Sequence, residues 1–164
     1  TPMVGLKALV AQLPDGLVPR PPPSPLLGRW NGEVQGRSTC NLAMDMDPHT
    51  VNIEVTTSHK RERYDLVYKG PHPRAQVRGT HRAECQMRKG NLVCSGWTRT
   101  KHRPDLLDPV MRNKDGTYPV KLVMRLSPPK KKGQPATGLM WGLAKYPKGR
   151  EDHCPTVWDV SLTR

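Results

Sequence analysis

Apolar and polar residues alternate with a period of two over much of this chain, and this alternation predicts β-strands. It is clearest over residues 40–46, 51–55, 120–126 and 158–162. About eight short segments of this kind are separated by turns rich in Gly, Pro and Asp, which is typical of a sandwich or a closed barrel. Because closure removes exposed strand edges and the order needs no long crossover, we predict an all-β, eight-stranded antiparallel up-and-down barrel.

The first strand of this barrel is predicted to begin within residues 26–34, where Gly28 and Trp30 form a Gly-x-Trp step. Glycine lets the chain turn inward at little steric cost, and the indole is large enough to plug the floor of a small barrel. Residues 156–164 supply the last alternating segment, which lies beside the first strand in a closed meander. Trp30 is therefore expected to be a structural residue at the closed end.

The segment before the first strand has a different pattern. Leu6, Leu9, Val10 and Leu13 have helical spacing, and residues 14–25 are rich in proline, which favours an extended spacer. We therefore divide the chain into an N-terminal arm, residues 1–25, with a short helix and a linker, and a barrel domain, residues 26–164. The helix either packs on the end of the barrel or docks on a partner.

The net positive charge of the chain indicates which kinds of partner the barrel could bind. The 164 residues suit one domain, and 27 Lys and Arg against 14 Asp and Glu give a formal net charge of +13. Such a charge attracts nucleic acid, anionic lipid or an acidic protein face, although it also serves solubility alone. No apolar run reaches the roughly 18 residues of a membrane span, so none is expected. The start at Thr1 suggests a processed mature chain.

The four cysteines are an even number, which permits two disulfides and predicts a secreted protein or an organelle lumen, with an organelle matrix as the alternative. If Lys89 and Gly90 are the central residues of a two-residue turn, Cys85 faces Cys94 at a closely spaced cross-strand position. A three-residue loop would shift this register.

The remaining two cysteines, Cys40 and Cys154, lie near the first and last strands and are a candidate second disulfide. The alternative is a zinc site, formed by Cys40, Cys85, Cys94 and His153, although the short Cys-x₂₋₄-Cys spacing of zinc ribbons is missing. Disulfides are the expectation, with no metal and no cofactor.

Five short motifs occur in the order in which calycin barrels carry them. They are Leu27-Gly28-Arg29-Trp30, Arg63-Tyr64-Asp65-Leu66, Ser95-Gly96-Trp97-Thr98, Met140-Trp141-Gly142-Leu143 and Ser161-Leu162-Thr163-Arg164. This set resembles calycin barrels, and among them the avidin/streptavidin family, over most of the chain after Leu26. The Gly-x-Trp opening and an Arg near the end are also shared with the lipocalins.

The resemblance implies a barrel with an aromatic-lined mouth. Trp97, Trp141 and Thr57 match ligand-lining positions of the family, and Tyr64 is added as a wall residue. The polar residue that avidins place two positions after the first Trp is replaced here by Gly32, and the polar group near the end of their last strand falls at Val160. Biotin is therefore not implied, and residues 75–85 and 102–115 are expected to be insertions.

Basic residues gather in the expected loops. The candidate polyanion contacts are Lys130, Lys131, Lys132, Arg99, Lys101 and Arg103. RNA-binding folds interleave exposed aromatic side chains with such cations, whereas the tryptophans here lie inside strand patterns. The six histidines, most of them beside Arg or Lys, are expected to be solvated.

No catalytic motif stands out: a Ser-His-Asp order, a carboxylate pair in apolar surroundings and a phosphate-binding glycine loop are all missing. We therefore expect a non-catalytic barrel that holds a small hydrophobic or ring-containing ligand, or a partner segment, at its mouth. The alternative is a basic accessory subunit of a large assembly, organellar or ribonucleoprotein, docked by its arm and charged loops, with nucleic acid as a candidate partner.

Overall fold

The computed structural model describes residues 24–37, 47–73, 78–100, 114–144 and 157–164. Within them the secondary structure is all β. The strands are β1 (Gly28–Arg37), β2 (His49–Thr57), β3 (Tyr64–Pro71), β4 (Arg78–Arg88), β5 (Asn91–Thr100), β6 (Tyr118–Ser127), β7 (Ala136–Ala144) and β8 (Val157–Thr163). The predicted arm, residues 1–25, and the predicted alternation over 40–46 lie almost wholly outside the described residues, which begin with Ser24.

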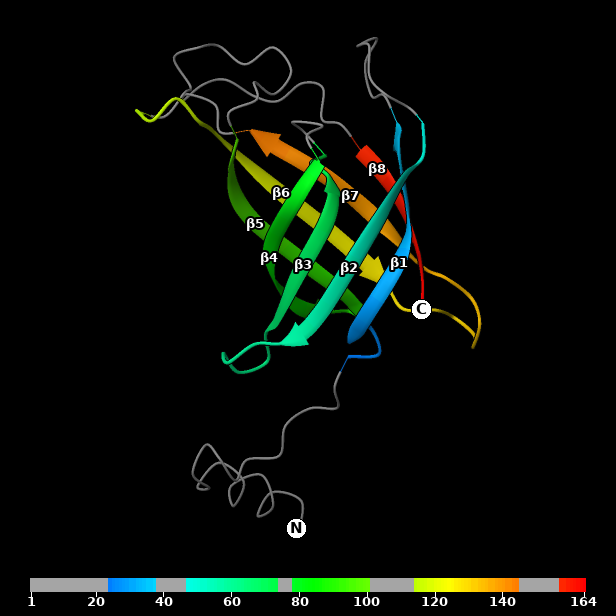
Figure 1. Ribbon diagram of the computed structural model, residues 1–164. Coiled ribbons are helices and arrows are strands. Elements are labelled where there is room, and N and C mark those ends of the chain that lie inside the picture. Colours follow the sequence, from blue (N-terminus) through cyan, green and yellow to red (C-terminus); the bar gives the residue numbers. More distant parts are fainter. Residues whose placement is uncertain (1–23, 38–46, 74–77, 101–113, 145–156) are drawn as a thin grey trace, which may run out of the picture.

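Each strand pairs antiparallel with the next along the chain, and β8 pairs with β1, which closes the barrel (Figure 1). The register of closure places Asn31 opposite Thr163 and Arg37 opposite Val157. The predicted eight-stranded up-and-down barrel is therefore confirmed. This architecture is consistent with a calycin-like barrel.

The core is the inside of the barrel, and it is built by the alternation that the sequence shows. On β2, Val51, Ile53 and Val55 are buried between exposed or half-exposed neighbours. Every strand contributes in this way, and the largest fully buried side chains include Trp158, Tyr68, Leu66, Leu92, Leu122, Met124, Met140 and Leu162. An eight-stranded barrel has an interior just wide enough for such side chains or for one small ligand.

Trp30 closes one end of the barrel, as predicted. Its side chain is 3% exposed, and its Nε1–H donates a hydrogen bond of 2.8 Å to the carbonyl oxygen of Leu26. The guanidinium of Arg164 lies 4.3 Å from the indole centroid and donates to the carbonyl oxygen of Pro25 at 2.7 Å. Gly28 has a φ of +110°, and a Cβ there would come within 3.2 Å of Arg164. The segment that enters β1 and the residue that follows β8 therefore contact each other around the Trp30 indole.

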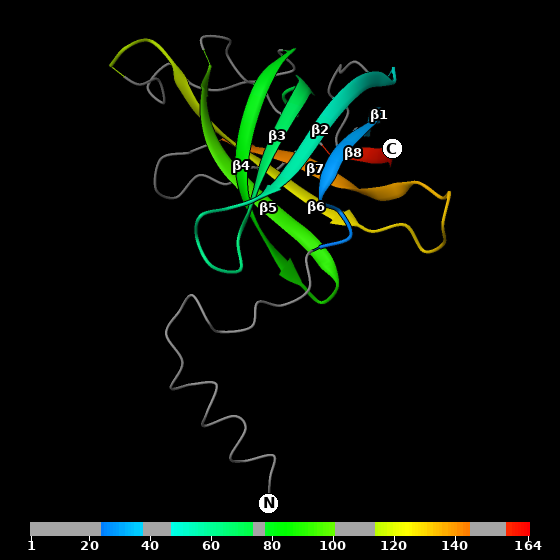
Figure 2. The same ribbon diagram turned by 60° about the horizontal axis from the view of Figure 1, so that its bottom comes forward.

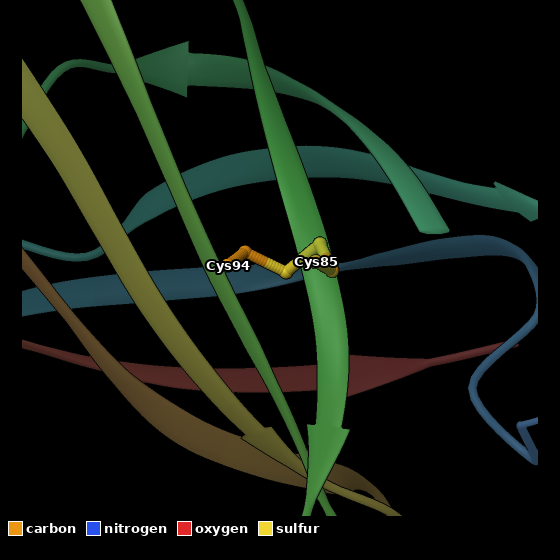
Figure 3. The surroundings of a disulfide bond; sticks show 2 residues. All are labelled: Cys85 and Cys94. Carbon is orange, nitrogen blue, oxygen red and sulfur yellow. A yellow bond between two sulfur atoms is a disulfide. The ribbon is translucent and has the colours of Figure 1, made fainter. Parts of the chain in front are cut away.

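The β4–β5 hairpin has the predicted two-residue turn. Lys89 and Gly90 both have positive φ, 50° and 80°, as a type I′ turn requires. This turn sets Cys85 opposite Cys94, and the two form a disulfide inside the barrel wall with a Cα–Cα distance of 4.0 Å (Figure 3). The three-residue loop is excluded.

The disulfide also excludes the proposed Cys₃His zinc site, because both thiols are oxidised. The other members of that site, Cys40 and His153, lie outside the described residues, as does the candidate pair Cys40–Cys154.

Candidate functional site

The four residues predicted to line the mouth do not meet. Trp97 and Trp141 point away from the interior, because their neighbours Gly96 and Met140 take the inward positions. Trp97 is 56% exposed, and Trp141 is half-buried on the outer wall.

The other two predicted mouth residues lie on different strands. Thr57 and Tyr64 pair across β2 and β3, where Thr57 is exposed and Tyr64 is buried. The expectation of Trp97 and Trp141 as interior wall residues is therefore wrong, since strand alternation turns them outward.

The basic loops instead gather at the end of the barrel that Trp30 closes. The β2–β3, β4–β5 and β6–β7 connections all lie at this end, because every second turn of a meander returns to the same side (Figures 1 and 2). These connections and the adjoining end of β4 carry Lys60, Arg61, Arg63, Arg88, Lys89, Lys130, Lys131 and Lys132. We call this the basic end.

Not all of the predicted cations belong to the basic end. Arg99 pairs with Pro119 at the start of β6, whereas Lys130 follows the end of that strand, so the two lie toward opposite ends of the barrel. The Arg99 guanidinium also forms an ion pair with Asp115 at 3.5 Å. Lys101 and Arg103 lie outside the described residues.

A groove opens at the basic end, with a volume of about 470 Å³. It is lined by Pro25, Trp30, Pro129, Lys130, Lys131, Lys132, Gly133, Gln134, Thr163 and Arg164. We call it the lysine groove. It lies between the entry to β1, the β6–β7 loop and the last residue, where Figure 1 shows the C-terminus beside that loop.

A tight backbone turn in the β6–β7 loop brings Lys130, Lys131 and Lys132 close together. The Gln134 amide donates to the Lys131 carbonyl oxygen at 3.1 Å, and Gly133 has a φ of +84°. A positive φ at the third residue is what a type II turn needs, and glycine supplies it without strain. Lys132 therefore lies at the tip of a tight turn, with Lys130 and Lys131 entering it.

The electrostatics of the lysine groove favour an anion. Its lining contains four cationic side chains and no carboxylate side chain. Within the part of the chain that the structure describes, Lys130, Lys131 and Lys132 form no ion pair. Arg164 is already held by Pro25 and the Trp30 ring, which fixes its charge at the base of the groove. The arrangement can bind a phosphate or carboxylate group.

A second cluster lies at the opposite end, where two histidines pack together. His72 is 1% exposed and lies edge-on to His81, with 5.0 Å between the ring centroids. The Tyr68 ring stacks on His81 at 5.8 Å, and its hydroxyl donates to the Pro71 carbonyl oxygen at 2.7 Å. The expectation that the histidines are solvated is therefore wrong for His72, because the chain folds it over the top of β3.

Burial sets the protonation of this cluster. Burial, and to a smaller extent the neighbouring His81, lower the pKa of the His72 imidazole from 6.5 to about 3. Burial also raises the pKa of the Tyr68 hydroxyl, against a smaller lowering by Arg78. Both groups are neutral at physiological pH, which suits a packed structural cluster.

Among the described residues, no group of three or more His, Cys, Asp or Glu side chains is placed to hold a metal ion.

The described segments contain no helix long and apolar enough to cross a membrane. The fold belongs to the class of eight-stranded antiparallel up-and-down barrels. No family model, curated protein or solved structure matches the chain.

Proposed function

We propose that this protein is a non-catalytic barrel that binds a phosphate-bearing partner in the lysine groove. The observation that carries the proposal is the lining: Lys130, Lys131, Lys132 and Arg164 surround a groove of about 470 Å³ that holds no carboxylate side chain. The proposal keeps the accessory, polyanion-docking role suggested by the sequence. It assigns that role to the basic end.

The groove is preorganised in a way that a solvated run of lysines is not. The turn at Gly133 and the contacts of Arg164 with Pro25 and Trp30 fix the backbone and one of the charges before a ligand arrives. An ordered cationic site loses less conformational entropy on binding than a flexible one, so more of the Coulomb attraction contributes to affinity. The net charge of +13 adds a long-range field that steers anions toward the protein.

A ligand in the barrel mouth is a weaker alternative. Trp97 and Trp141 lie on the outer wall, so they do not supply the expected aromatic lining. A Cβ at Gly32 would fall 1.9 Å from the carbonyl oxygen of Ser161, so a polar side chain there requires a shift of β8. The order of the five motifs and the Trp30–Arg164 contact support a relationship to avidin-type barrels, whereas the ligand site of that family is not part of our proposal.

We further propose that the protein acts in an oxidising compartment, outside the cell or in an organelle lumen. The Cys85–Cys94 disulfide supports this location, because cytosolic reductants keep most such pairs as thiols.

Calorimetric titration with inorganic tripolyphosphate tests the lysine groove. The variant Lys130→Gln/Lys131→Gln/Lys132→Gln is compared with Lys69→Gln/Arg82→Gln/Lys114→Gln, which removes the same charge from exposed positions elsewhere. Each contact between unit charges in water contributes about 1 kcal/mol at 4 Å, so losing the three lysines should weaken binding by more than about tenfold. The control should change affinity much less. Equal losses in both variants would show a diffuse charge effect and refute the site.

A further inference from the structure

The outer wall of β5, β6 and β7 carries an exposed aromatic and cationic surface that the lysine groove does not use. Trp97, at 56%, and Leu139, at 37%, are the exposed large hydrophobic residues of the described chain. The outward positions of this wall include Val93, Trp97, Lys121, Val123, Arg125, Leu139, Trp141 and Leu143. We call this surface the β5–β7 face.

The strand register interleaves rings and charges on this face. Lys121 lies directly between Trp97 and Leu143, and Val123 lies beside Trp141. The Lys121 Nζ is 5.7 Å from the centroid of the Trp97 ring. The two indoles are two strands and two residues apart, about 12 Å from the usual strand spacing and rise.

The charge around the indoles is positive. Lys121 and Arg125 point outward from β6, and the formal net charge of the chain is +13. The acidic residues that border the face are each paired with a cation: Glu84 with Lys60 at 3.2 Å, Asp159 with Arg37 at 2.9 Å and Asp115 with Arg99 at 3.5 Å. Two copies of this chain would therefore bring like charges together if they met through this face. A partner that complements it is anionic and carries flat apolar rings.

We propose that the β5–β7 face binds single-stranded nucleic acid. Unpaired bases stack on Trp97 and Trp141, the phosphate between them contacts Lys121, and Arg125, which pairs with Leu139 just beyond Trp141, contacts the next phosphate. Single-strand-binding folds use this combination of an aromatic platform and a cationic track. A duplex hides the faces of its bases inside the helix, so the outward-facing indoles favour a single strand over a duplex of equal charge.

This inference goes beyond the proposed function, because the face and the lysine groove share no residue. Tripolyphosphate has no ring to stack, so its binding does not depend on the indoles, and the lysine variants assign it to the groove. Binding of an oligonucleotide that depends on Trp97 reports on the face.

The test is fluorescence anisotropy of a fluorescein-labelled oligothymidylate of about 16 nucleotides, the upper range for one single-strand-binding fold. Trp97→Ala should weaken binding roughly 5- to 150-fold, as expected for the loss of one stacked base. Lys121→Gln should lower the slope of log affinity against log salt by about 0.7, as expected for one phosphate contact on a single strand. Val67→Ala, an apolar truncation on the outside of β3, is the matched control and should bind like the parent.

Three results would overturn the proposal. The first is unchanged affinity in both Trp97→Ala and Lys121→Gln, and the second is equal affinity for the single strand and a duplex of equal total charge. The third is sedimentation showing a dimer that Trp97→Ala dissociates while the oligonucleotide does not bind, which would assign the face to a second copy of the chain. Because Trp97 is exposed, Trp97→Ala should melt like the parent, and the melting curve verifies this.

Discussion

Reducing the Cys85–Cys94 disulfide should lower the free energy of unfolding by about 2.6 kcal/mol. The two residues are nine positions apart along the chain, and the loop-closure expression for a cross-link of that length gives this value at room temperature. The stabilisation comes mainly from the unfolded chain, which loses conformations when the bond is closed. In the folded hairpin the strand register places the two cysteines opposite each other.

Urea unfolding of the oxidised and reduced protein measures this difference. The Cys40→Ser/Cys154→Ser background removes the other two cysteines, and Cys85→Ala/Cys94→Ala in that background is the matched variant that can never close the bond. With a slope of about 2 kcal/mol per molar urea, the midpoint should fall by about 1 M on reduction. The oxidised form should also show the smaller slope, because its unfolded state exposes less surface.

Coincident oxidised and reduced unfolding curves would refute this reasoning, since they would mean that the bond constrains nothing in the unfolded state. Non-reducing peptide mapping gives an independent check. A free Cys85 in the native protein would contradict the hairpin register itself.

Two further predictions concern the ends of the barrel. Trp30→Ala should lower the unfolding free energy by roughly 3–5 kcal/mol, the usual effect of a core aromatic truncation, and a variant that melts like the parent would contradict the closing role of Trp30. The folded-state pKa of His72 is about 3 against an ordinary 6.5, so the unfolded chain takes up the proton first. The contribution of His72 to the unfolding free energy should therefore be full above pH 6.5 and fall toward pH 3 by up to about 1.4 kcal/mol per pH unit. His72→Gln should flatten this slope in acid unfolding curves. An unchanged slope would contradict the burial of a neutral His72.

The strand alternation made the architecture predictable, and one turn made the disulfide predictable. On β2 the outward row is polar, and on β6 it carries Lys121 and Arg125, so the inward row can be chosen from the sequence. The Lys89-Gly90 pair has the chemistry of a two-residue turn, and counting outward from it sets Cys85 against Cys94. The residue pattern within each strand and the turn residues themselves were therefore sufficient to predict the inward rows and the disulfide.

The orientation of the tryptophans was not predictable in the same way. On β7 both rows are apolar, since Leu139, Trp141 and Leu143 alternate with Met140 and Gly142. Hydrophobicity cannot choose between two such rows, and the resemblance to a ligand-binding family favoured the wrong one.

On β5 a usable signal existed. If Cys94 points inward to reach Cys85, Trp97 three residues later must point outward. The burial of His72 follows from how the chain crosses the end of the barrel after Pro71, which no local pattern encodes.

The most direct test of anion binding in the lysine groove is a titration of the ¹⁵N-labelled full chain with inorganic tripolyphosphate, followed by amide chemical shifts. We predict saturable amide shifts confined to residues 130–134 and 163–164, with the amides of His72, His81 and the β5–β7 face unchanged. Shifts centred on the histidine end, or shifts that follow exposed basic residues over the whole surface without saturation, would contradict it.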